Sequence, residues 1–155
     1  MTVTGTNVHD IAQRRLRAIN QRYSPRRRSL VEALMQAPHP LVATDIVATD
    51  EELSQSTVYR NLSVLESAGV VVKVLTNGDR AAFELAEDLK GHHHHLVCLD
   101  CGTVLDVDFP AEVENSLDTG MRKVAERTGF TVLGHRLDLV GRCRDCSRSA
   151  GGRRH

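Results

Sequence analysis

Histidines and cysteines, the side chains that bind transition metals, crowd into residues 92–101 of this 155-residue chain. The cysteines form two CxxC pairs that lie far apart in the sequence: Cys98 with Cys101, and Cys143 with Cys146. Paired CxxC motifs of this kind are typical of a tetrahedral zinc site with four thiolate ligands. We therefore predict a structural zinc ion bound by all four cysteines, which leaves no thiolate for catalysis.

The run of four histidines directly before the first CxxC pair needs a separate explanation, because four consecutive imidazoles cannot all face one ion. If the run begins a β-strand, successive side chains point to opposite sides. His92 and His94 then share one face, and His93 and His95 share the other. This geometry favours two further metal sites. A solvated polar strand is the alternative; the remnant of an affinity tag is set aside, because tags lie at termini.

Composition narrows the class of protein. Hydrophobic residues make up 41% of the chain and aromatic residues only 3%, so the core is expected to be aliphatic. There is no apolar run of the roughly 20 residues that a membrane span needs, and MTVTGTNVHD does not resemble a signal peptide. We expect a cytoplasmic protein without a membrane partner, in which CxxC pairs bind metal more often than they form disulfides.

The net charge is zero, but its distribution is uneven. Residues 1–30 hold seven arginines against a single acid, Asp10. A local basic face can attract phosphates even when the whole chain is neutral. A solvated helix face is the simpler reading of the same pattern.

Residues 1–86 are expected to form one domain. Hydrophobic periodicity and capping residues predict helices over 8–21, over about 11 residues from Pro25, over 44–49, and from Ser54 to Gly69. The segment VVVKVL, the turn signal Asn77-Gly78 and residues 80–85 then predict a two-stranded hairpin. Helices followed by such a hairpin describe a winged helix-turn-helix DNA-binding domain.

The helix that begins after Ser54 is the predicted DNA-reading element. Its apolar residues at helical spacing form a buried stripe: Val58, Leu62, Leu65 and Ala68. Its other side carries polar groups suited to a DNA major groove: Gln55, Ser56, Tyr59, Arg60 and Ser63. Alone, this pattern also fits an ordinary amphipathic helix; the predicted wing favours the DNA-binding interpretation.

The second half is expected to form a small α/β dimerisation and metal-binding domain over 92–147, joined to the first by a hinge at 87–91. Its predicted elements are strands over 92–99, 103–107 and 130–140 and a helix over about 111–128. The exposed edge of the last strand could pair with a second copy and yield a two-fold dimer. Residues 148–155 are expected to be a disordered tail. The fold class is therefore α+β.

The order of these features closely resembles the ferric uptake regulator (Fur) family of bacterial metal-dependent repressors. The resemblance runs from about Gln13 to Cys146 and rests on TVYRNL in the reading helix, on HHHHLVCLDCG and on GFTVLGHRLDLVGRCRDC. It implies a homodimer that binds a palindromic double-stranded DNA operator when loaded with metal and represses genes of metal uptake. It implies neither enzymatic activity nor a small organic substrate.

The resemblance also apportions the candidate ligands. The family's regulatory site would here consist of His39, Glu84, His93, His95 and Asp106. A further site would consist of His92, His94, Glu114 and His135, with Glu112 as an alternative to Glu114. The DNA contacts implied by the reading helix, the wing and the basic N-terminal region are Arg17, Arg26, Ser56, Thr57, Tyr59, Arg60 and Arg80.

The identity of the regulatory ion stays open between zinc, iron and manganese, because an all-nitrogen-and-oxygen site accommodates each of them. Many zinc-sensing members of the family add a cysteine ligand at the hinge, but this chain has no fifth cysteine and carries Ala86 and Asp88 there. Asp106 stands where iron sensors commonly have glutamate and peroxide-sensing relatives have aspartate. A peroxide-sensing repressor is therefore an alternative function.

Two other classes of protein are rivals. A zinc hydrolase would need HExxH, which is absent, and a zinc deaminase would need Pro-Cys-x-x-Cys, where this chain has Val97 instead of proline. A metal-storage or chaperone protein could use the histidine run but would not need a winged helix.

Overall fold

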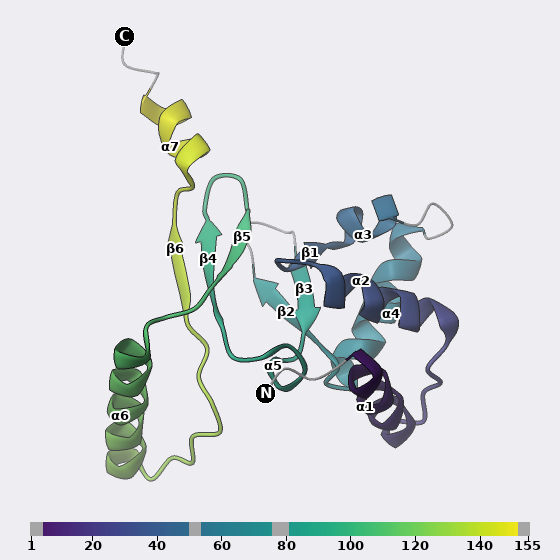
Figure 1. Cartoon of the computed structure of the whole chain (residues 1–155), viewed down its shortest axis with the longest axis horizontal. Coiled ribbons are helices and arrows are strands. Elements are labelled where there is room, and N and C mark those ends of the chain that lie inside the picture. Colours follow the sequence, from purple (N-terminus) through teal and green to yellow (C-terminus); the bar gives the residue numbers. More distant parts are fainter. Residues whose placement is uncertain (1–4, 50–53, 76–80, 152–155) are drawn as a thin grey trace.

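The computed structural model describes residues 5–49, 54–75 and 81–151 (Figure 1). Its N-terminal half contains α1 (Gly5–Ala18), α2 (Pro25–Gln36), β1 (Leu41–Val42), α3 (Ala43–Thr49), α4 (Gln55–Ser67), β2 (Val71–Leu75) and β3 (Ala81–Leu85). Its C-terminal half contains α5 (Glu87–Lys90), β4 (His94–Cys98), β5 (Val104–Val107), α6 (Ala111–Thr128), β6 (Asp138–Gly141) and α7 (Arg144–Gly151).

Serine caps start two of the helices where the sequence predicts. Ser24 Oγ accepts a hydrogen bond from the backbone N–H of Arg27 at 3.4 Å, and Pro25 occupies the first turn of α2. Ser54 Oγ accepts from the backbone N–H of Thr57 at 3.3 Å and begins α4. These caps place α4, the predicted reading helix, directly against α2 and α3 (Figure 1).

The N-terminal half is the predicted winged helix-turn-helix. The helices bury an aliphatic cluster that includes Leu16, Leu30, Val58 and Leu62, each at most 1% exposed. The sheet beside them has the order β1-β3-β2, with both neighbouring pairs antiparallel. The short strand β1 is a third strand that the sequence analysis did not predict; the predicted turn at Asn77-Gly78 lies outside the described residues.

Strand β3 joins the two halves, because one of its faces packs against the N-terminal helices and the other against the C-terminal half. Phe83 and Leu85 face the helical core, whereas Ala82 belongs to a second cluster with Val74, Val97 and Val104. Since side chains alternate along a strand, Glu84 points the same way as Ala82, toward the C-terminal half. The wing sheet thus presents a buried carboxylate to the second domain.

The C-terminal sheet has the order β5-β4-β6, with β4 antiparallel to β5 and parallel to β6. Helix α6 spans the predicted 111–128, and Gly129 ends it with a left-handed φ of 67°. The prediction of a strand over 130–140 was wrong for most of its length, because only β6 forms and residues 129–137 are neither helix nor strand. An apolar alternation gives a segment strand propensity, but it does not supply the neighbouring strand that the backbone must pair with.

One other boundary differs from expectation. The segment predicted as the hinge contains a short helix, α5. The expected disordered tail does not begin at residue 148, because α7 continues through residue 151; residues 152–155 lie outside the described part. In α7, the backbone N–H of Ser147 bonds to the carbonyl of Cys143 at 3.0 Å, so the second cysteine knuckle starts a helical turn.

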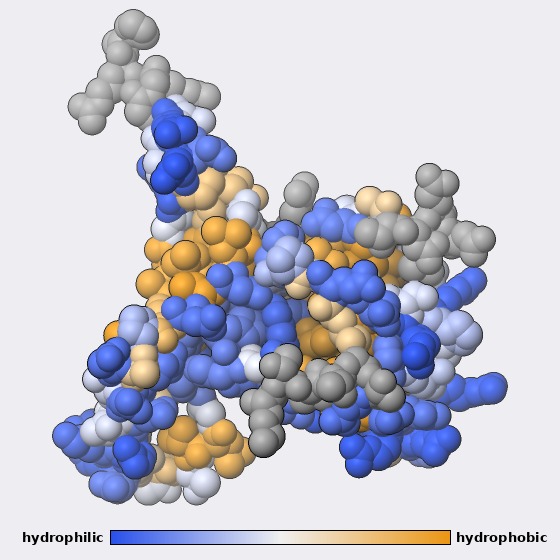
Figure 2. Space-filling view, viewed as in Figure 1, coloured by the Kyte–Doolittle hydropathy of each residue, from blue (hydrophilic) through white to orange (hydrophobic). Residues whose placement is uncertain are grey.

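Apolar surface is concentrated in the C-terminal half. Helix α6 buries none of its residues, and it stands away from both sheets in Figure 1. Figure 2 shows orange surface over the β4–β6 region and beside α6. Among the described residues, no helix is both long and apolar enough to cross a membrane.

Candidate metal centres

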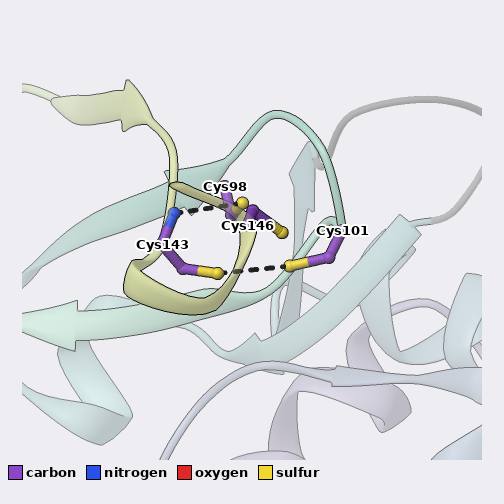
Figure 3. Close-up of side chains that lie close together, drawn as sticks. All are labelled: Cys98, Cys101, Cys143 and Cys146. Atoms are coloured by element: carbon purple, nitrogen blue, oxygen red, sulfur yellow. Dashed lines mark hydrogen bonds between the residues drawn. The ribbon is translucent and has the colours of Figure 1, made fainter. Parts of the chain in front are cut away.

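The four cysteines converge at one end of the second sheet, where Cys98 ends β4, Cys101 lies in the turn after it, Cys143 directly precedes α7 and Cys146 lies in its first turn (Figure 3). Their four sulfur atoms all lie within 4.8 Å of one another, and Cys101 Sγ is 3.8 Å from Cys143 Sγ. A tetrahedral zinc ion with Zn–S bonds of about 2.3 Å requires sulfurs roughly 3.8 Å apart. All four are free thiols and not disulfides, so the cluster has the geometry of a four-thiolate zinc site.

The surroundings of the cysteines favour thiolates at the first pair. Hydrogen bonds from the backbone of Cys101 and Cys143 lower the pKa of Cys98 to about 6. Hydrogen bonds from Thr103 lower the pKa of Cys101. The pKa of Cys146 is raised instead, because hydrogen bonds with the sulfurs of Cys143 and Cys101 favour its protonated form. Coordination needs deprotonated sulfur, which Cys98 and Cys101 provide most readily.

A second group lies at the hinge and combines Glu84, His93, His95 and Asp106, with one ligand atom of each within 4.8 Å of the others. His93 Nε2 is 2.9 Å from Glu84 Oε2, and His95 Nε2 is 3.1 Å from Glu84 Oε1. Glu84 comes from the wing strand β3, whereas His95 and Asp106 lie on β4 and β5, where they are register partners. Ligand atoms from both domains therefore meet at a single point.

The two histidines of this hinge cluster are held with Nε2 toward it. His93 Nδ1 donates to the carbonyl of Gly91 at 2.8 Å, and His95 Nδ1 donates to Asp138 Oδ1 at 3.0 Å. When one ring nitrogen is tied in this way, the other is presented to a metal. Two buried atoms of the cluster, His95 Nε2 and Asp106 Oδ1, make no hydrogen bond of good geometry, although His95 Nε2 lies 3.1 Å from Glu84 Oε1. Unsatisfied buried donors and acceptors of this kind fit a bound cation.

The charge balance of the hinge cluster also suits a cation. Burial raises the pKa of Glu84, but pairing with His95, Lys90 and His93 lowers it more, to about 2. Burial lowers the pKa of His95, but its contacts with Glu84 and Asp138 raise it above the usual value. Glu84 is therefore a carboxylate at only 5% exposure, which requires positive partners around it.

Sequence reasoning missed two residues of the hinge cluster. Asp138, on β6, orients His95, and the Lys90 ammonium is 2.9 Å from Glu84 Oε2 and also contacts Asp106 Oδ2. Neither belongs to a spaced motif. The sequence signal available for Asp138 was its place three residues after His135 in an apolar stretch. The signal available for Lys90 was that it is the lone cation of the predicted hinge.

His39 is not brought into the hinge cluster, contrary to expectation. Its Nδ1 lies 3.1 Å from the carbonyl oxygen of Pro40, so the ring is held against its own turn. It lines a cleft of about 590 Å³ together with Asp45 and with Asp100 and Cys101 of the first cysteine knuckle. The two flanking prolines restrict the turn, and β1 begins directly after it.

A third group lies on the opposite face of β4 and joins His92, His94, Glu114 and His135. His94 Nε2 is 2.7 Å from Glu114 Oε1, and His92 Nε2 is 3.4 Å from Glu114 Oε2. His135 Nε2 is buried without a hydrogen-bond partner, 3.9 Å from the same carboxylate. Between the two candidate acids, the structure brings Glu114 to these histidines and leaves Glu112 outside the group.

All of the candidate DNA contacts except Arg80 lie on three helices. Tyr59 and Arg60 are exposed on α4, Arg17 on α1 and Arg26 on α2. The hydroxyls of Ser56 and Thr57 are within 3.1 and 2.8 Å of Ser54 Oγ, so both also take part in the helix cap. Arg80 lies outside the described residues.

Two arginines of the basic N-terminal region have structural partners instead. Arg27 bonds to Asn61 Oδ1 at 3.2 Å and to Gln21 Oε1 at 3.0 Å, which ties α2 to α4. Arg15 pairs with Asp88 of the hinge. The basic face is therefore smaller than the arginine count suggests.

Comparisons with known proteins agree with this architecture. The model of the "Ferric uptake regulator family" matches residues 18–140. The chain is 34% identical over 137 residues to the peroxide operon regulator of Bacillus subtilis (strain 168), covering 86% of this chain and 89% of that protein. It is 33% identical over 122 residues to the ferric uptake regulation protein of Klebsiella pneumoniae, covering 76% of this chain and 74% of that protein.

Among solved structures, the ferric uptake regulator Fur of Helicobacter pylori, reported with three functional metal binding sites, shares the fold. The TM-score is 0.74 at 23% identity, covering 94% of this chain and 95% of that chain. The fold and the site define a metal-responsive transcription regulator with a winged-helix domain. The chain belongs to the ferric uptake regulator family, whose members are regulators of transcription.

Proposed function

We propose that this protein is a homodimeric repressor that binds a palindromic operator when a divalent cation fills the hinge cluster. The observation that carries the proposal is the origin of the ligands. Glu84 belongs to the wing of the DNA-binding domain, whereas His93, His95 and Asp106 belong to the second domain. A cation bound by both domains favours one relative orientation of them, which a ligand-driven switch requires.

The donor set limits the choice of cation. The hinge cluster offers imidazole nitrogens and carboxylate oxygens and no sulfur, which suits Zn(II), Fe(II) and Mn(II). The four-cysteine cluster, in contrast, is proposed to hold a structural zinc ion that ties β4 to α7. The group formed by His92, His94, Glu114 and His135 is proposed as an additional metal site.

DNA reading is assigned to α4. Its exposed Tyr59 would meet base edges or a thymine methyl, and Arg60 would contact phosphates, with Arg17 and Arg26 on the neighbouring helices. In a two-fold dimer the two reading helices would lie about one turn of DNA apart, which calls for a palindrome. Genes of metal uptake are the proposed targets.

A second copy is the proposed partner of the apolar surface in the C-terminal half. Val124 on α6 is 50% exposed, and Phe130 and Leu133 just beyond it are 71% and 96% exposed. The outer side of β6 is a sheet edge, and Val140 on it is 65% exposed. An exposed apolar surface next to an open edge is typical of an interface between copies.

The test begins by selecting duplexes from a randomised DNA library with the Mn(II)-loaded protein. Affinity for the selected duplex is then measured by fluorescence anisotropy in buffered Zn(II), Mn(II) or Fe(II), and in chelator. We expect tight binding only with a cation. Equal affinity with and without every cation would exclude the proposed switch, and failure to select any duplex would favour a metal-storage protein.

The matched variant is His93→Ala combined with His95→Ala. It should lose cation-dependent DNA binding while its circular dichroism and its zinc content at the cysteines stay unchanged. If the variant unfolds, the hinge cluster has a structural role and the assignment is wrong.

A peroxide-sensing repressor is the second candidate. Asp106 at the hinge cluster and the 34% identity to a peroxide operon regulator favour it. In that case peroxide should release DNA from the Fe(II)-loaded protein but not from the Mn(II)-loaded one, with oxidation at His93 or His95 detected by mass spectrometry. Release without such oxidation, or none at all, would leave the metal-responsive repressor.

A further inference from the structure

Lys90 places a positive charge inside the hinge cluster. Its Nζ is 2.9 Å from Glu84 Oε2 and also contacts Asp106 Oδ2, and its side chain is 20% exposed. Glu84 belongs to the wing and Asp106 to the second domain, so one ammonium group bridges two carboxylates across the domain junction. Both carboxylates are also the proposed ligands of the regulatory cation.

We propose that Lys90 is a built-in competitor of the regulatory cation: its ammonium group and a divalent ion compete for the same oxygens of Glu84 and Asp106. Lys90 thereby sets the cation concentration at which the hinge cluster fills. This inference rests on the proposed regulatory function of the cluster and adds an affinity-determining residue that is not itself a ligand.

The remaining donors of the hinge cluster show which contact Lys90 itself contributes. The Nδ1 atoms of His93 and His95 are tied to Gly91 and Asp138, which leaves their Nε2 atoms directed at the cluster. Of the two carboxylates, these Nε2 atoms lie closest to Glu84, at 2.9 Å for His93 and 3.1 Å for His95. Lys90, in contrast, contacts both Glu84 and Asp106, so a cation that binds both carboxylates must displace the ammonium group from each of them.

The backbone around Lys90 holds the ammonium group in place. Lys90 is the last residue of α5, and its backbone N–H bonds to the carbonyl of Ala86 at 3.1 Å. The preceding residue, Leu89, is only 4% exposed and packs in the core of the DNA-binding domain. Lys90 therefore projects from an anchored helical turn, which gives its ammonium group a high effective concentration at the cluster. A cation that displaces this ammonium group from the carboxylates must overcome that free-energy cost.

The experiment measures Mn(II) binding to the zinc-loaded full-length protein by the electron paramagnetic resonance signal of free Mn(II). The hinge-cluster component is the binding that is lost when His93→Ala and His95→Ala are combined. We expect Lys90→Met to tighten this component at least about tenfold, equivalent to about 1.4 kcal/mol. The reason is that the two carboxylates lose a positive partner within hydrogen-bond distance.

Two controls separate charge from packing. Lys90→Arg keeps the positive charge and should stay near the wild-type affinity. Lys123→Met removes the same charge from the exposed surface of α6 and should leave the affinity unchanged. Unchanged or weaker binding by Lys90→Met would overturn the proposal, as would an equal tightening in Lys90→Arg, because the effect would then come from disturbing α5.

Failure of the proposed function has a different signature. If the wild-type protein shows no Mn(II) binding that depends on His93 and His95, the regulatory site itself is in question, and Lys90→Met then decides. If Lys90→Met then shows Mn(II) binding that depends on His93 and His95, the result would support Lys90 as a competitor. It would also show that the wild-type site fills only at a higher Mn(II) concentration. Absence of binding in both proteins would overturn the competitor and the regulatory site together.

Discussion

The two halves of this protein are stabilised in different ways. The N-terminal half buries a continuous, mostly aliphatic cluster whose residues run from Val8 to Leu85, and Leu89 of α5 joins it. Beyond the hinge, the described residues of the C-terminal half contribute Val97 and Val104 to a small cluster at the junction, and α6 buries no residue. Among the residues that the structure describes, all exposed large apolar side chains except Ile19 and Tyr59 belong to the C-terminal half.

This difference shows which half can fold by burying its own side chains. In a single copy, the side chains that meet inside the C-terminal half are mainly the candidate metal ligands, and not the large apolar side chains that form the core of most domains. Under the proposed function, metal coordination and a second copy that covers the apolar surface would supply the stabilising free energy that this half lacks. The arrangement suits a metal-responsive regulator, because the half whose stability is proposed to depend on bound ions also carries most ligands of the proposed regulatory site.

The largest expected effect that tests this comparison is loss of the zinc ligands. Cys98→Ser should abolish zinc binding at the cysteines and the folded structure of residues 92–151, because structural zinc contributes on the order of 10 kcal/mol in small zinc domains. The helices α1 to α4 should keep their amide protection. Hydrogen exchange read by mass spectrometry, with zinc content measured in parallel, checks both halves separately.

The control for that variant is Ser147→Ala, which changes an exposed residue of α7 and should preserve both zinc and protection. Full amide protection over residues 92–151 in Cys98→Ser would contradict the comparison, because the C-terminal half would then be stable without its metal.

The opposite change is a cavity in the N-terminal core. Leu62, on α4, is fully buried, so Leu62→Ala should lower the free energy of unfolding by about 2–5 kcal/mol. Zinc at the cysteines should remain bound. The matched control is Ile19→Ala, which removes apolar carbons from a side chain that is 38% exposed and should cost much less. Urea unfolding followed by circular dichroism measures both, and zinc loss in Leu62→Ala would argue against independent stabilisation.

The same contrast explains how much could be predicted from sequence. In the N-terminal half, caps and periodicity are local signals, so Ser54, the stripe Val58-Leu62-Leu65 and the hairpin predicted the winged helix. The four-cysteine cluster and the division of the histidine run between two faces of β4 also followed from spacing. The family resemblance then suggested Glu84, Asp106, Glu114 and His135, which the structure brings to these clusters.

What could not be predicted depends on long-range contacts. The segment 130–137 has an apolar pattern, but it remains without a partner strand within this copy, so pattern alone misplaced most of the last strand. His39 was assigned by resemblance and is held instead by its own turn. Lys90 and Asp138 are single residues whose roles arise only when β3, β4, β5 and β6 meet.

Asp138 allows a sharper test of how the C-terminal half positions its ligands. Asp138→Asn removes the carboxylate that accepts from His95 Nδ1 and keeps a similar shape. Loss of such an outer partner weakens metal binding about 10- to 100-fold, so Mn(II) affinity of the hinge cluster should fall by that factor. Asp118→Asn, an exposed change on α6, is the matched control. Unchanged affinity in Asp138→Asn would mean that His95 is oriented by packing alone.

The smallest expected effect concerns the apolar side of α6. Val124→Asp places a carboxylate among apolar side chains of α6 and its following segment, with Val113, Leu117 and Phe130 lining the same groove. If a second copy covers this groove, burying that charge should raise the dimer dissociation constant at least about tenfold, measured by sedimentation velocity over a range of protein concentrations. Asn115→Asp adds the same charge to the other side of the helix and should leave the dimer intact. Equal sedimentation of both variants and the wild type would mean that the apolar surface of the C-terminal half is covered by something other than this chain, and that metal coordination alone compensates for its missing core.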